Sequence, residues 1–106
     1  MGRNHLRVIG ESPDFELAGV VDVGPAPAAQ LPHGASYLSD VKALSSINFD
    51  AAVIVTPTTT HRDVALEILR MKKHVLCEKP IAATFAQGRE VCDAAASMGV
   101  KLAVGH

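Results

Sequence analysis

The chain has 106 residues and a formal net charge of −1, and 48% of its residues are hydrophobic, 20% charged and only 4% aromatic. These values are ordinary for a soluble globular protein of at most one domain. No apolar run approaches the ~20 residues of a membrane span, and no group of Lys and Arg is dense enough to bind nucleic acid. The basic N-terminus lacks the apolar stretch of a signal peptide. We therefore expect a cytoplasmic protein with neither a membrane nor a nucleic-acid partner.

The first half of the chain predicts one helix, two strands and a second helix. Apolar residues at helical spacing predict a short helix over residues 1–12, and residues 16–22 (ELAGVVD) predict a buried strand that ends in an acid. Three prolines disfavour a regular helix in residues 24–36, so we expect an irregular connection there. A short edge strand is expected at residues 36–38, followed by a helix through Ser46 for which Asp40 is a candidate cap.

The second half alternates regularly between strands and helices. Residues 50–56 (DAAVIVT), 74–77 (HVLC) and 100–104 predict three apolar strands. The helices between them are marked by two capping-box spacings, Thr60 with Asp63 and Thr84 with Gln87. The helix after Thr84 is expected to end at Gly99. Its inward stripe is predicted to consist of Gly88, Val91, Cys92, Ala95 and Met98.

This order of elements predicts an α/β fold with a doubly wound parallel sheet. Such a fold begins with a strand, whereas this sequence begins with a helix. In the strand order 3-2-1-4-5-6, the absent first strand lies between the second and the fourth. We therefore expect the apolar strands near residues 17–21 and 52–55 to have exposed edges, which favour self-association.

The two cysteines are not arranged as a metal or redox motif. Cys77 and Cys92 lie 15 positions apart and form no CxxC pair. In a protein of this composition we expect two reduced, packed thiols and no metal site.

A glycine and an acid stand at the spacing of a dinucleotide-binding unit. Gly2 opens the first helix, and Asp22 ends the next strand 20 positions later. In such units the glycines let the backbone approach the pyrophosphate, and the acid accepts hydrogen bonds from the adenosine ribose. A carboxylate at Asp22 repels a 2′-phosphate, and no Arg follows it, so we expect NAD rather than NADP.

Four segments together resemble one family of enzymes. The segments are TPTTTH at residues 56–61, HVLCEKPIA at 74–82, GVKLAVGH at 99–106 and MGRNHLRV at 1–8. They are similar, in order and spacing, to the Gfo/Idh/MocA oxidoreductases. The resemblance implies a Rossmann-like NAD(P)-binding domain, with Gly2 at the position of the third glycine of the family motif. Residues 1–106 are then expected to form a partial dinucleotide-binding domain that lacks the first strand and the C-terminal substrate domain.

The resemblance also implies roles for individual residues. It places Lys79 beside the nicotinamide and the reacting hydroxyl, where a lysine helps proton transfer during hydride transfer, and Glu78 at the nicotinamide ribose or as a partner of Lys79. A lysine desolvated near a positive ring can exchange a proton near neutral pH. Pro80 is expected to follow a cis bond. Among the remaining residues, Arg3 and Asn4 are expected at the start of the first helix, near the pyrophosphate. Thr56, Pro57 and Thr58 are expected against the pyrophosphate or as a strand stop and helix cap. His61 is expected as a cofactor contact or a cap, and His106 is a candidate contact near the nicotinamide.

The expected activity of the parent protein is that of an NAD(P)-dependent dehydrogenase. It would transfer hydride between the nicotinamide and a hydroxyl or ketone of a sugar-type substrate. The segments most resemble the branch of the family that acts on UDP-N-acetylglucosamine at its 3-hydroxyl. The alternatives are a non-catalytic nucleotide-binding or subunit-interaction module and an inactive truncated fragment.

Overall fold

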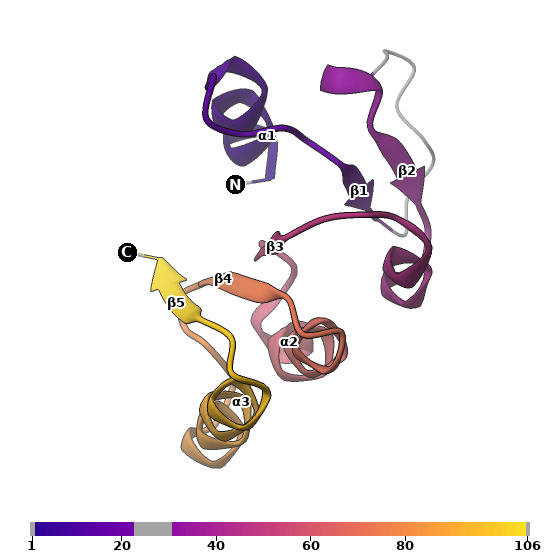
Figure 1. The fold of residues 1–106 in the computed structure, drawn as a ribbon. Coiled ribbons are helices and arrows are strands. Elements are labelled where there is room, and N and C mark those ends of the chain that lie inside the picture. The colour runs from indigo at the N-terminus through magenta and orange to yellow at the C-terminus, as the bar shows by residue number, and fades with distance from the viewer. Residues whose placement is uncertain (1, 23–30, 106) are drawn as a thin grey trace. The chain divides into compact units, whose positions relative to one another are not determined.

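Residues 2–22 and 31–105 are described by the computed structural model, and they belong to two compact units, Met1–Asn48 and Phe49–His106. The first unit contains a two-stranded parallel sheet in which Gly19 pairs with Ser36 and Val21 with Leu38 (Figure 1). Its elements are α1 (Gly2–Glu11), β1 (Gly19–Val21), the 3₁₀ turn η1 (Pro32–Gly34), β2 (Ser36–Leu38) and the 3₁₀ helix η2 (Val41–Ser46).

β1 is shorter than the predicted strand, which was expected to span residues 16–22. The strand begins only at Gly19, although Leu17 is buried as predicted. The backbone N–H of Leu17 donates to Nδ1 of His33 at 2.7 Å. A side chain therefore takes the place of a neighbouring strand as acceptor, and the ladder starts later. The expected irregular connection at residues 24–36 lies partly outside the described residues.

The predicted cap of the next helix is confirmed. The carboxylate of Asp40 accepts a hydrogen bond from the N–H of Lys42 at 2.9 Å. The helix that follows is a 3₁₀ helix that ends at Ser46, where the expected helix ends.

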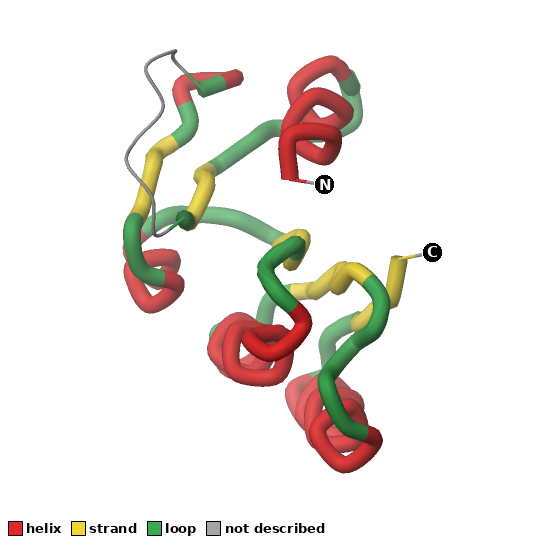
Figure 2. The backbone as a smooth tube through the Cα atoms, turned by 180° about the vertical axis from the view of Figure 1, so that it is seen from behind, coloured by secondary structure: helices red, strands yellow, loops and turns green. Residues whose placement is uncertain are grey.

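The second unit is a three-stranded parallel sheet in the order β3-β4-β5, with α2 and α3 on the same face (Figures 1 and 2). Val75 and Cys77 of β4 point toward the helices and are buried, whereas Leu76 between them is 36% exposed. The core on the helix side includes Leu69 and Val91, both fully buried. The elements are β3 (Ala51–Ile54), α2 (Thr58–Arg70), β4 (His74–Glu78), α3 (Phe85–Met98) and β5 (Leu102–Gly105).

The ends of α3 follow the sequence prediction, and the start of α2 does not. Thr84 caps α3 by accepting from the N–H of Gln87, and Gly99 ends it in the left-handed conformation at φ 69°. The capping box expected at Thr60 is wrong, since α2 begins two residues earlier, at Thr58. The hydroxyl of Thr60 lies 2.6 Å from the carbonyl oxygen of Pro57, so it is engaged within the first helical turn.

The strand order within each sheet agrees with the predicted topology. Within its own sheet, β1 pairs only with β2, and β3 pairs only with β4. Among the described residues, each of these two strands therefore has one edge without a hydrogen-bonded neighbour in its sheet. In the order 3-2-1-4-5-6, this is the edge that faces strand 1 of that order, which is a different strand from β1.

Candidate cofactor site

The carboxyl ends of parallel strands meet at one edge of a sheet, and ligands of α/β folds bind at that edge. In the second unit Glu78 is the last residue of β4 and pairs in register with Gly105, the last residue of β5. Lys79 and Pro80 follow directly, and Thr56 follows β3 after one intervening residue. The structure therefore brings most of the predicted cofactor-binding residues of this unit to one edge.

The carboxylate of Glu78 lies against the backbone of Gly105. A Cβ atom built on Gly105 would lie 3.4 Å from each of the two carboxylate oxygens. The methyl group of an alanine there would make ordinary van der Waals contact with the carboxylate. The γ-atoms of a branched side chain would extend from the Cβ atom toward the carboxylate. The glycine thus leaves space for the half-buried Glu78 side chain at the strand ends.

Lys79 is exposed, and the peptide bond that joins it to Pro80 is cis, as the sequence suggested. Its side chain is therefore accessible from solvent. In this unit Glu78 and Lys79 supply one acceptor group and one cationic donor next to each other at the end of a strand.

His61 lies near the start of α2, as expected, but it does not cap the helix, and its contact with a cofactor stays a prediction. Its ring is 1% exposed, with Nδ1 2.8 Å from the carbonyl oxygen of Pro80 and Nε2 2.8 Å from that of Thr56. It connects the loop after β3 to the loop after β4. The N-cap position of α2 is taken by Pro57, which makes no side-chain cap.

The segment before α2 is open to solvent. Thr56 and Pro57 are exposed and Thr58 is half-buried. The hydroxyl of Thr56 lies 2.7 Å from that of Thr60. The strand stop and helix start anticipated for these residues are therefore observed, while their contact with a pyrophosphate stays a prediction.

In the first unit, Asp22 is exposed at the carboxyl end of β1. Its N–H donates to the carbonyl oxygen of Leu38 at 3.0 Å, which continues the ladder by one residue. Burial, and then the negative charge of Asp22, raise the pKa of Tyr37 on β2. The carboxylate is thus presented beside a tyrosine that the sequence did not single out. Gly2, Arg3 and Asn4 begin α1, and His106 lies outside the described residues.

The prediction of two packed thiols holds for Cys77 and is wrong for Cys92. Cys77 is fully buried beneath α2 and α3, whereas Cys92 is exposed because the buried stripe of α3 runs through Gly88, Val91 and Ala95. Burial, and then the charge of Glu78, raise the pKa of the Cys77 thiol. A thiol with a raised pKa has less thiolate, which is the reactive form.

Alkylation is therefore expected to distinguish the two cysteines. Brief treatment of the folded chain with iodoacetamide near neutral pH should add one group, at Cys92. Mass spectrometry of the digested protein locates the adduct, and treatment in denaturant, where both thiols react, provides the control. Equal labelling of Cys77 in the folded chain would contradict the buried position of its thiol.

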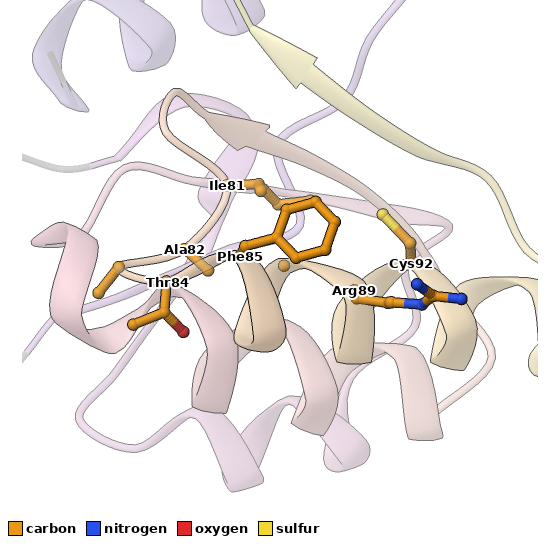
Figure 3. A pocket seen from close by; sticks show the side chains of 8 residues that line it. Ile81, Ala82, Thr84, Phe85, Arg89 and Cys92 are labelled. Atoms are coloured by element: carbon orange, nitrogen blue, oxygen red, sulfur yellow. The ribbon is translucent and has the colours of Figure 1, made fainter.

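A shallow pocket lies beside the first turns of α3 (Figure 3). Its lining is mostly apolar, includes the 84% exposed Phe85, and contains neither Glu78 nor Lys79. It offers no carboxylate for ribose hydroxyls. The residues that line it are Ile81, Ala82, Ala83, Thr84, Phe85, Gly88, Arg89 and Cys92.

Within residues 2–22 and 31–105, no helix is long and apolar enough to cross a membrane. The same residues contain no group of three or more His, Cys, Asp or Glu side chains placed to hold a metal ion.

The second unit has parallel strands with helices packed on one face, and acids stand at the carboxyl ends of β1 and β4. These are features of the class of dinucleotide-binding α/β domains. Residues 1–106 match the family described as the oxidoreductase family with an NAD-binding Rossmann fold. The chain belongs to this family, Gfo/Idh/MocA, as its segments predicted.

Individual relatives agree with this assignment. The chain is 31% identical to inositol 2-dehydrogenase of Rhizobium meliloti (strain 1021) over 99% of its length, and 37% identical to 1,5-anhydro-D-fructose reductase of Ensifer adhaerens over 95%. The WlbA dehydrogenase of Bordetella pertussis, solved in complex with NADH and UDP-GlcNAcA, superposes with a TM-score of 0.89 at 32% identity over 98% of the chain. The chain spans about a third of the length of these proteins: 32%, 30% and 33%, respectively.

Proposed function

We propose that this chain is the cofactor-binding part of a dehydrogenase that transfers hydride between a nicotinamide cofactor and a hydroxyl or ketone of a sugar-type substrate. The observation that carries the proposal is the adjacent pair Glu78 and Lys79 at the carboxyl end of β4, with Gly105 beside the carboxylate. The names of the relatives, an inositol dehydrogenase and an anhydrofructose reductase, support a sugar-type substrate.

The described residues have the chemistry that a dinucleotide needs. The carboxylates of Asp22 and Glu78 accept hydrogen bonds from ribose hydroxyls, Asp22 on the adenosine side and Glu78 on the nicotinamide side. NAD, when bound, supplies or takes up the hydride. Lys79 exchanges a proton with the substrate oxygen, for which its exposed ammonium group is accessible.

The cofactor preference depends on Asp22. Its carboxylate is exposed and stands beside Tyr37, so a 2′-phosphate placed there would meet a like charge. We expect NADH to bind at least about tenfold more tightly than NADPH, because a like-charge contact that costs about 1.4 kcal/mol raises the dissociation constant tenfold.

A titration followed by nicotinamide fluorescence tests both the binding and the preference. Asp22→Ala should weaken NADH and bring the two cofactors to within about threefold of each other. Asp14→Ala, which removes another exposed carboxylate of the same unit, should leave the preference unchanged. The absence of saturable binding to either cofactor would refute the proposed function, and a preference that survives Asp22→Ala would refute the role of Asp22.

A nucleotide sugar is the substrate that we propose for the dehydrogenase. The support is the similarity to WlbA, whose structure contains NADH together with UDP-GlcNAcA. The expected reaction is oxidation of the 3-hydroxyl of UDP-N-acetylglucosamine with reduction of NAD. Reduction of NAD with an inositol but not with the nucleotide sugar, in an assay of the dehydrogenase, would contradict this choice.

The free strand edge of the second unit favours a second role in self-association. The N–H of His74 donates to the carbonyl oxygen of Asp50, and alternate residues of a parallel strand bond to the same neighbour. The backbone groups of Ala51 and Val53 therefore face away from β4. Such an edge pairs readily with another chain.

We expect the sedimentation coefficient to rise with protein concentration. Val53→Pro removes an edge N–H without removing a bond to β4, and should leave the chain monomeric; proline is tolerated at strand edges. Val53→Thr keeps the N–H and should associate like the original chain. Monomeric behaviour of the original chain at all concentrations would rule out this role.

A further inference from the structure

One buried polar side chain has no part in the function proposed above. Among the described residues, His61 is the polar side chain that lies in the core, at 1% exposure. Both of its ring nitrogens face carbonyl oxygens, at 2.8 Å each. Polar groups in a core are retained where they are hydrogen-bonded, and each ring nitrogen of His61 has a carbonyl oxygen within hydrogen-bond distance as an acceptor for an N–H.

The two carbonyl groups belong to the loops that carry the proposed cofactor residues. The carbonyl of Thr56 lies between β3 and α2, and the carbonyl of Pro80 lies just after the Glu78–Lys79 pair. A shift of Pro80 would move the backbone of Lys79 with it, because the two are covalently joined. The ring therefore connects the segment after β4 to the segment before α2.

The two contacts of the ring are not equivalent. A neutral imidazole has one N–H and donates to only one of the two carbonyl oxygens, whereas a doubly protonated ring donates to both. Nδ1 faces Pro80 and Nε2 faces Thr56. Only the contact through Nδ1 acts on the segment that carries Lys79.

We propose that His61 is a positioning residue: the N–H at Nδ1 holds the Pro80 carbonyl and thereby fixes Glu78 and Lys79 for the cofactor. The consequence for the cofactor rests on the proposed function, whereas the hydrogen bond itself does not. The competing explanation is a general packing role, in which any side chain of similar size at position 61 serves equally well.

Two conservative substitutions separate these explanations. The amide nitrogen of asparagine falls near the position of Nδ1, and that of glutamine near the position of Nε2. His61→Asn therefore keeps a donor toward Pro80, and His61→Gln keeps one toward Thr56. His61→Leu, of similar volume but without a donor, provides the reference for complete loss.

The first measurement needs no cofactor. Amide hydrogen exchange at Lys79 and Ile81 should be faster in His61→Gln and His61→Leu than in the original chain, and nearly unchanged in His61→Asn. In the original chain, NMR of the His61 ring should show a proton on Nδ1 that exchanges slowly with water. A ring with Nδ1 unprotonated, or equal exchange at Lys79 in all three variants, would overturn the proposal even if a variant folds poorly.

The second measurement is NADH affinity. We expect His61→Gln and His61→Leu to raise the dissociation constant about five- to tenfold, the effect of one buried hydrogen bond, and His61→Asn to stay within about twofold. Equal losses in His61→Asn and His61→Gln would indicate packing alone and overturn the proposal. If the original chain binds no NADH, the proposed function fails, and the exchange measurements still decide whether His61 holds the turn.

Discussion

Replacing Leu69 with alanine is expected to lower the free energy of unfolding by about 3 kcal/mol. Leu69 is fully buried on α2, which packs against β3, β4 and α3. The substitution removes three carbon atoms from the centre of the second unit and leaves a cavity that the surrounding helices and sheet fill only in part. Native domains have a free energy of unfolding of only about 5–15 kcal/mol, so the substitution removes a large part of it.

Urea unfolding followed by far-ultraviolet circular dichroism measures this loss. Leu76→Ala is the matched control, since Leu76 is also a leucine of the second unit but is 36% exposed on the opposite face of β4. We expect it to cost less than about 1.5 kcal/mol. Similar losses for the two variants would contradict the placement of the core on the helix side of the sheet.

The Gly105→Val substitution is expected to weaken NADH binding more than tenfold. The new side chain starts from a Cβ atom only 3.4 Å from both carboxylate oxygens of Glu78, and its γ-carbons extend into the space around that carboxylate. Glu78 must then rotate away and lose the hydrogen bonds that we propose it makes to the nicotinamide ribose. Charge-assisted hydrogen bonds contribute roughly 1.5–3 kcal/mol, which corresponds to about ten- to hundredfold in affinity.

Ala103→Val serves as the control for Gly105→Val. Ala103 lies two residues earlier on β5, so its side chain points to the same face, and it is exposed. It should bind NADH as the original chain does, with thermal stability similar to that of Gly105→Val. Unchanged affinity in Gly105→Val would show that the Glu78 carboxylate does not contact the cofactor.

Local sequence signals were sufficient where one residue decides the conformation. Asp40 and Thr84 were predicted as helix caps from side-chain chemistry, and Gly99 as a left-handed helix end from its lack of a side chain. The strands of the second unit were predicted from short apolar runs, and the observed strands lie within one residue of those runs or inside them.

Tertiary contacts decided the features that the sequence did not predict. The late start of β1 depends on His33 accepting from Leu17, two residues that are 16 positions apart. Cys92 belongs to the helical repeat of α3, but α2 and the sheet cover only the neighbouring stripe that contains Val91. No spacing rule specifies which of two adjacent helix positions faces the core.

The candidate site was predicted as a set of residues but not as an arrangement. The segment around Glu78, Lys79 and Pro80 was recognised from its sequence, including the cis bond. The contact of Gly105 with Glu78 and the bridge made by His61 each join residues from different strands or loops. A glycine at the end of a predicted strand was the available signal for Gly105, since a residue without a side chain often marks a close approach.

We propose that a dinucleotide binds at the carboxyl ends of the strands. The most direct test is an NADH titration of the isotopically labelled chain, followed through its backbone amide signals. We predict saturable shifts at Asp22, Glu78 and Lys79, and none at Phe49 and Lys73, which precede β3 and β4 at the opposite strand ends. Saturable shifts at Phe49 and Lys73 alone, or no saturable shifts at any residue, would contradict binding at the carboxyl ends.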